Sequence, residues 1–425
     1  MKLARKFYAS LLEAAKAHAR WDLEVSRNII KDRRKVWLLI ALTAVGVFGT
    51  YALAASTGAD LDLPAMLGGK KAYTPAFYTT GIFLASIAIG LCAGLITGCI
   101  GAGGGFIITP ALMSAGIKGI LAVGTDLFHI FAKAIMGTAV HKKLGNVSVS
   151  LAVAFLAGSG AGVLGGGVLN RLIYEANPVA SDAFISVIYV VLLGFLGIYA
   201  LTDFLRLRKA GGGVDAHGGG GSDDSGGLPA KLQAAQIPPM ITFDEDLVPG
   251  GKKISGWFVA VCGSIVGFMA AIMGVGGGFL TFPMFVYVLG VSSFTTVGTD
   301  ILQIIFTAGF AAISQYAIYG FIFYTLAMGM LLGSLLGIQI GALVTKLVPG
   351  IYIRGFYALA ILSGFVNRLF AMPGKLDDMK IINIGPAMSG ILATIGNWLF
   401  FVVIGIFAVW VIGTFLTKLK TLREG

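Results

Sequence analysis

The segments Gly101–Phe106 and Gly274–Phe279 read GAGGGF and GVGGGF, and each is followed four residues later by a proline, Pro110 or Pro283. The first segment lies in an apolar run from residue 77 to residue 115, which would measure about 58 Å as a single helix. The apolar core of a bilayer is only about 30 Å thick. The helix must therefore be interrupted, and the glycines mark the place. The sequence predicts a pair of broken helices, one in each half of the chain.

A second motif follows each glycine segment, because Val123–Asp126 and Val297–Asp300 both read VGTD. Its distance from the preceding proline differs by one residue between the two copies. Two motifs that recur in the same order indicate an internal duplication. When the loops are placed alternately on the two sides of a membrane, the first copy starts outside and the second inside. The two halves are therefore predicted to be inverted repeats.

The composition excludes an ordinary soluble domain. Hydrophobic residues make up 57% of the 425 positions and charged residues 12%, which is about half the usual charged share. The apolar runs at 36–56 and 385–416 are continuous, so they predict helices rather than strands of a barrel. Glycines spaced by four, such as Gly329, Gly333 and Gly337, predict close helix contacts. The expected fold is an all-α membrane protein, a polytopic bundle of about nine or ten spans with broken helices.

Charge and composition divide the chain. The expected parts are a cytoplasmic amphipathic basic segment (1–35), an extra first span (36–56), repeat 1 (77–205), a cytoplasmic flexible linker (206–255), repeat 2 (256–370) and a C-terminal span (385–417). Basic residues concentrate in loops on one side, which predicts a multi-pass protein of the inner (plasma) membrane with both termini cytoplasmic. The net charge of +11 then reflects orientation, and no nucleic acid is expected. The first segment could instead be a solvated or partner-binding helix, and the linker a regulatory or docking loop.

The glycine segments are candidates for an anion site. Unwound glycines expose backbone amides, and a helix that starts after them directs its positive dipole end toward the same point. The alternative is that the glycines only allow helices to cross closely; their recurrence with a proline favours a site. The segments lack the pattern of a nucleotide-binding loop. The candidate substrate-binding glycines are Gly101, Gly103, Gly104, Gly105, Gly274, Gly276, Gly277 and Gly278.

Ionisable residues within the predicted spans are further candidates, because burying them is costly. Asp126, His129 and Lys133 share one helical face. Lys133 is a candidate anion contact, or a counter-ion of Asp126. Asp126, His129 and Asp300 are candidates for proton coupling. Otherwise each aspartate, or the threonine before it, caps a half-helix, and His129 is a hydrogen-bonded core residue. Arg368 is expected to extend to the outer interface. The sequence contains no metal-ligand cluster and no nucleophile–base pair, so neither a metal, a cofactor nor enzymatic activity is expected.

The doubled glycine motif with its proline, together with the paired VGTD segments, resembles the TauE/SafE sulfite exporter family of membrane permeases. The resemblance covers 77–205 and 256–416. It implies an inner-membrane permease that moves sulfite, sulfonates or related small anions, commonly as export. The chain departs from compact members of the family in its basic N-terminal segment, its extra first span and its long central linker.

The sequence therefore predicts a secondary transporter for a small anion that works by alternating access. Its expected partners are the anionic substrate, the lipid bilayer and a proton as a candidate coupling ion, and a homo-oligomer is compatible with the sequence. Two other classes stay open. One is a membrane sensor or scaffold that uses the basic N-terminal segment, and the other is an anion channel.

Overall fold

The computed structural model describes residues 80–100, 104–141, 148–209, 228–244, 251–344 and 348–418. Within these residues, eight helices are long and apolar enough to cross a membrane. The predicted all-α polytopic fold is confirmed, with one two-stranded sheet as the only strands in the described part. The amphipathic segment (1–35) and the extra first span (36–56) lie outside the described residues.

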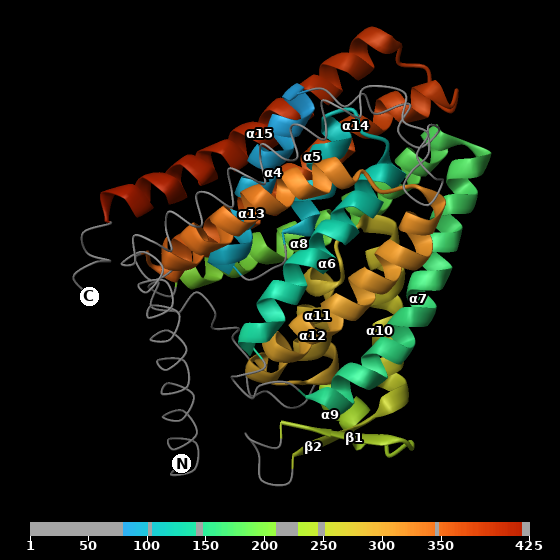
Figure 1. The fold of residues 1–425 in the computed structure, drawn as a ribbon, viewed down its shortest axis with the longest axis vertical. Helices are drawn as coiled ribbons and strands as arrows, with labels where there is room; N and C mark the ends of the chain where they lie inside the picture. The colour runs from blue at the N-terminus through green and yellow to red at the C-terminus, as the bar shows by residue number, and fades with distance from the viewer. Residues whose placement is uncertain are drawn as a thin grey trace.

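The helices follow one another in the same order in both halves of the chain (Figure 1). The first half consists of α4 (Thr80–Ile100), α5 (Gly105–Ser114), α6 (Gly119–His141), α7 (Val149–Ala176) and α8 (Pro178–Lys209). The second half consists of α10 (Gly256–Met273), α11 (Gly278–Pro283) with its π-helical continuation η3 (Met284–Leu289), α12 (Ser293–Ala311) with η4 (Ala312–Tyr316) and η5 (Ala317–Tyr319), α13 (Tyr324–Val344) and α14 (Gly350–Asp378). A final helix, α15 (Pro386–Thr417), follows.

The most extensive helix pairs join one half of the chain to the other. The first helix of each half packs along the fourth helix of the other, α4 with α13 and α10 with α7. The third helices, α6 and α12, pack together, as do the fifth helices, α8 and α14. In Figure 1, α7 and α10 lie side by side at the right, and α4, α13 and α15 run together across the upper part. An approximate twofold relation between the halves gives this pattern of pairs.

Glycines form the closest of these contacts, which confirms the predicted seams. A β-carbon on Gly90 would overlap the backbone of Met330, and one on Gly98 would overlap the backbone of Ile338. The contacts of later residues in α4 are with later residues in α13, so the two helices run parallel. In the other pair, Gly158 and Gly162 of α7 meet the backbone of Ala260 and Ser264 of α10 in the same parallel sense. The predicted seam glycines Gly333 and Gly337 of α13 meet the backbone of α4.

The fifth helices show that the repeats are inverted. Gly197 of α8 lies against Leu362 of α14, whereas Phe204, further along α8, lies against Gly355, which is earlier in α14. The two helices are therefore antiparallel. Because they are equivalent members of the two halves, one half must be turned over relative to the other, as the sequence predicted.

The central segment corrects one expectation. The sequence predicted a flexible linker over residues 206–255, yet α8 continues to Lys209, and the later part of the segment is folded. It contains a short helix, α9 (Leu228–Ala234), and the strands β1 (Met240–Phe243) and β2 (Lys252–Ser255), which pair antiparallel with Met240 opposite Ser255. Asp244 is buried and accepts hydrogen bonds from the amide and hydroxyl of Ser292, at 2.9 and 2.7 Å. This unit is fastened to the turn that precedes α12.

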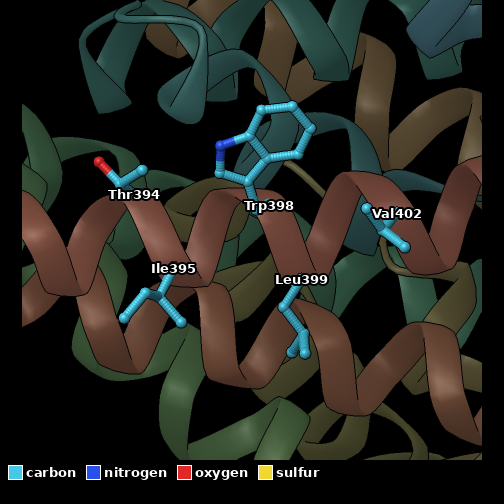
Figure 2. Close-up of a pocket in the computed structure, with 5 residues that line it drawn as sticks. All are labelled: Thr394, Ile395, Trp398, Leu399 and Val402. Atoms are coloured by element: carbon cyan, nitrogen blue, oxygen red, sulfur yellow. The ribbon is translucent and has the colours of Figure 1, made fainter.

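Helix α15 closes the described chain with an apolar outer face. Thr394, Ile395, Trp398, Leu399 and Val402 line a shallow groove there (Figure 2), and the side chain of Trp398 is 69% exposed. Such a face suits contact with lipid acyl chains, which need no polar partner.

Candidate functional site

The predicted breaks are present and depend on glycine. Gly104 precedes α5 with φ 68°, and Gly277 precedes α11 with φ 94°. Gly274 and Gly276, which connect α10 to α11, also have positive φ values, 81° and 68°. Residues with side chains rarely adopt this conformation, so glycine is required at these four positions. The other two candidates in the first break, Gly101 and Gly103, lie outside the described residues.

The two breaks meet in the core. A β-carbon on Gly105 would lie 2.9 Å from the Cα of Val275, so the first half-helix starts directly beside the second break. The ring of Phe106 stacks on the ring of Phe279, with centroids 5.0 Å apart and planes inclined by 23°. Both phenylalanines are buried. The structure thus brings together Gly104, Gly105, Gly274, Gly276, Gly277 and Gly278, which the sequence proposed as one site.

Each half-helix begins with amides that its own helix does not use. In α5 the first hydrogen-bonded amide is that of Ile107, which donates to the carbonyl of Gly104 at 3.1 Å. In α11 it is that of Leu280, which donates to Gly277 at 2.8 Å. The two amides before each of these have no acceptor within their helix, as at every helix start. Two sets of such amides, with two positive dipole ends, therefore converge.

Asp126 and His129 form a buried polar cluster in α6, and both are fully buried. Thr109 of α5 donates a hydrogen bond to Asp126 Oδ2 at 3.0 Å. His129 Nε2 lies 2.9 Å from the hydroxyl of Ser334 in α13, and His129 Nδ1 lies 3.7 Å from Asp126 Oδ1. Those last two atoms have no hydrogen-bond partner among the described residues. The carboxyl and imidazole groups face each other and can exchange a proton with little movement.

Lys133 lies two turns after Asp126 in α6, next to the first break. Its Nζ is 3.5 Å from Thr97 Oγ1, which in turn donates to the carbonyl of Ala93 at 2.8 Å. A β-carbon on Gly104 would lie 2.7 Å from the same Thr97 oxygen. The lysine therefore adds positive potential beside the start of α5, as an anion contact requires.

The equivalent cluster in α12 carries fewer ionisable groups. Asp300 Oδ1 accepts a hydrogen bond from Gln303 Nε2 at 2.7 Å, and Gln303 Nε2 also lies 2.9 Å from the hydroxyl of Thr281 in α11. Thr307 donates to Gln303 Oε1 at 2.8 Å and is 2.9 Å from Ser159 Oγ. Asp300 lies against the second break, since a β-carbon on Gly278 would be 3.4 Å from its Oδ2. Glutamine and threonine here take the positions of His129 and Lys133.

The threonine of each VGTD motif, rather than the aspartate, caps a helix. Thr125 Oγ1 accepts a hydrogen bond from the amide of Phe323 at 2.9 Å, just before α13. Thr299 Oγ1 accepts one from the amide of Ser148 at 3.1 Å, just before α7. Among the described residues the aspartates accept hydrogen bonds from side chains instead, Asp126 from Thr109 and Asp300 from Gln303.

Arg368 corrects a second expectation. Its side chain does not extend to an interface; it is 2% exposed and is the largest of the fully buried side chains in the described part of the chain. Its Nη2 donates to the carbonyl of Pro110 at 3.2 Å and to the hydroxyl of Ser114 at 2.6 Å. Its Nε donates to Asn367 Oδ1 at 2.8 Å. The guanidinium thus lies against the last turn of α5.

Several polar residues of this region were missed from the sequence, because they are uncharged and belong to no motif. They are Thr97, Thr109, Ser159, Thr281 and Ser334, together with Tyr189, whose hydroxyl donates to the carbonyl of Met273 at 2.5 Å, just before the second break. Hydroxyls scattered through apolar helices are the signal that could have identified them, since each needs a partner in an apolar core.

The comparisons with known proteins agree with this architecture. The family model for sulfite exporter TauE/SafE matches residues 86–367. Two relatives from Bacillus subtilis (strain 168) are similar: probable membrane transporter protein YjnA, 27% identical over 256 residues (60% of this chain and 87% of the relative), and probable membrane transporter protein YunE, 24% identical over 275 residues (62% and 89%). No solved structure matches the chain. With a family match over more than half of its length and eight apolar helices of spanning length in its described part, the chain belongs to the sulfite exporter TauE/SafE family and is a multi-pass membrane transporter.

Proposed function

We propose that this protein is a secondary transporter, a permease or exporter, that moves sulfite, a sulfonate or a related sulfur-containing anion across the inner membrane by alternating access. One observation carries the proposal: the first turns of two inverted half-helices meet at the stacked rings of Phe106 and Phe279. The excess of basic residues in the loops on one side supports a cytoplasmic position for both termini.

Anion recognition follows from the helix starts. Each presents a partial charge of about half an elementary charge and at least two amides that have no acceptor within their own helix. Lys133 adds a full charge beside Gly104. This combination attracts a small oxyanion through dipoles and one cation, without a fixed ion pair that would hold the substrate too tightly to be released. The family description, sulfite exporter, supports a sulfur oxyanion as the substrate class.

Proton coupling is assigned to the first half of the chain. Asp126 and His129 are buried next to each other, and Thr109 connects Asp126 to the half-helix α5. Asp300 of the second half is bound by Gln303, which cannot carry a proton. A proton held between Asp126 and His129 would therefore alter the charge that the anion encounters at the first break.

Alternating access is supported by the helix pairs that join the two halves. The glycine seams join α4 to α13 and α7 to α10 so closely that each pair can move as one unit. Each half-helix follows one member of a pair, α5 after α4 and α11 after α10, so movement of one pair against the other would open the site first to one side and then to the other.

The test is flux of sulfite in proteoliposomes that contain the full chain. The proposal predicts saturable sulfite flux that is inhibited by sulfonates, and that accelerates when a proton gradient is imposed. Flux that rises linearly with sulfite concentration and ignores the proton gradient would support an anion channel instead. The absence of flux for every sulfur anion, in protein that unfolds cooperatively, would contradict a transport function and favour a sensor or scaffold.

A further inference from the structure

In the described part of the chain, no carboxylate lies within ion-pair distance of the buried Arg368. The nearby carboxylate of Asp182 is already occupied, because it accepts a hydrogen bond from the amide of Gly119 at 2.7 Å and pairs with Lys375 at 3.2 Å. The C-terminal end of α5 contributes about minus half an elementary charge. A net positive charge therefore remains in a buried position.

Two donor groups of this cluster, Arg368 Nη1 and the amide nitrogen of Asn397, stay available among the described residues. The hydrogen bonds of Arg368 use Nε and Nη2, which leaves both N–H groups of Nη1 without a partner in the described residues. Asn367 donates to Asn397 Oδ1 at 2.8 Å, and this orients the Asn397 side chain toward the cluster while its amide nitrogen keeps its donors. A cation with adjoining amide donors is the chemistry that recognises an oxyanion.

The position of this cluster connects it with the glycine breaks. Thr109, which binds Asp126, and Pro110, which binds Arg368, are consecutive residues of α5. Helix α5 has ten residues and is therefore about 15 Å long, with the break at its first residue and Ser114 at its last. The two positive centres lie at opposite ends of one half-helix, at a spacing that suits successive binding of one small anion.

We propose that Arg368 Nη1 and Asn397 form a second anion-binding site, an access site for the substrate at the end of α5 that the loop charges assign to the outside. The inference rests on the proposed function for its substrate, a sulfur oxyanion, and on the geometry of Arg368 for its location. An anion on the outside binds first at Arg368 and then passes along α5 to the breaks, and an exported anion takes the reverse route.

The test compares KM for sulfite presented from each side of oriented proteoliposomes. Arg368→Gln is expected to raise the external KM about tenfold and to leave the internal KM nearly unchanged, because it removes one strong interaction on one side only. Arg368→Lys should give a smaller increase. Asn397→Asp places a carboxylate beside the cation and should raise the external KM without loss of a buried arginine. Lys380→Gln removes an exposed cation as a control and should change neither KM.

Folding and the proposed function are checked separately. Sulfite-dependent thermal stabilisation of the purified full chain is measured without transport, and it should be reduced in Asn397→Asp relative to Lys380→Gln. If the wild-type protein transports no sulfite, the proposed function fails, and this binding measurement alone decides on the access site. The proposal would be overturned if Asn397→Asp had the same external KM as the Lys380→Gln control, or if sulfite stabilised the two variants equally.

Discussion

The ring of Phe106 stacks on that of Phe279, although the two residues begin half-helices in opposite halves of the chain. Each ring is buried, and together they hold the two glycine breaks against each other. The duplicated glycine motifs of the two halves therefore meet at this ring contact.

Replacing Phe279 by alanine tests that contact. The loss of a buried ring should lower the free energy of unfolding by about 3 kcal/mol. Phe195→Ala is the matched control, because that ring is 70% exposed on α8 and should matter little for packing. Thermal unfolding of both purified variants measures the difference. Equal melting temperatures for the two would show that the ring stack does not stabilise the centre.

The VGTD threonines provide a second test. Thr125→Val keeps the shape of the side chain but removes the hydroxyl that accepts from the buried amide of Phe323, so the free energy of unfolding should fall by about 1 to 3 kcal/mol. The same is expected for Thr299→Val, which removes the acceptor for Ser148. Thr296→Val is the control, since that buried hydroxyl has no partner among the described residues and its removal should be neutral or stabilising. A control as damaging as the other two variants would contradict the capping role.

The glycine seam of α7 can be tested with two substitutions on one helix. Gly158→Ala would force a methyl group onto the backbone of Ala260 and should destabilise the protein by about 1 to 3 kcal/mol. Gly160→Ala faces open space and should stabilise the helix by about 0.5 to 1 kcal/mol. Chemical denaturation in detergent measures both. The opposite order would show that α7 and α10 pack less closely than described.

The proton site is tested by making the first half resemble the second. In His129→Gln the new side chain can still bond Ser334, but it cannot carry a proton. Flux driven by a sulfite gradient should persist, whereas acceleration by a proton gradient should fall by at least about tenfold, which corresponds to a barrier about 1.4 kcal/mol higher for the coupled step. Gln303→Glu, at the equivalent position, should leave that acceleration in place. Undiminished acceleration in His129→Gln would assign the coupling elsewhere.

The sequence predicted the broken helices and the inverted repeats because both depend on patterns that recur along the chain. Repetition of the glycine segments identified the broken helices, and loop charges identified the inversion. The antiparallel α8 and α14 and the meeting of Gly105 with Val275 confirm both. The continuous apolar runs also predicted the spans, although α8 and α14 extend beyond the predicted ends of the two repeats, residues 205 and 370, to Lys209 and Asp378.

The sequence did not predict features that depend on tertiary partners. Arg368 reads as an interfacial residue because of its place near the end of a span, and only the packing of α5 against α14 explains its burial. Thr97, Thr109 and Ser334 acquire roles only through contacts with residues distant along the chain or one helix away. The folded strands of the central segment follow from pairing between residues on both sides of a loop, which composition does not reveal.

Sulfite flux in Gly277→Val tests the central claim, that the paired glycine breaks bind the transported anion, most directly. Gly277 has φ 94°, and valine cannot adopt that conformation without strain, so the start of α11 must change. Gly160→Val, at an open position on α7, is the control. We expect Gly277→Val to insert and purify like the control while its flux falls by at least about a hundredfold, the effect of about 2.7 kcal/mol at the site. Flux equal to that of Gly160→Val would contradict a transport site at the breaks.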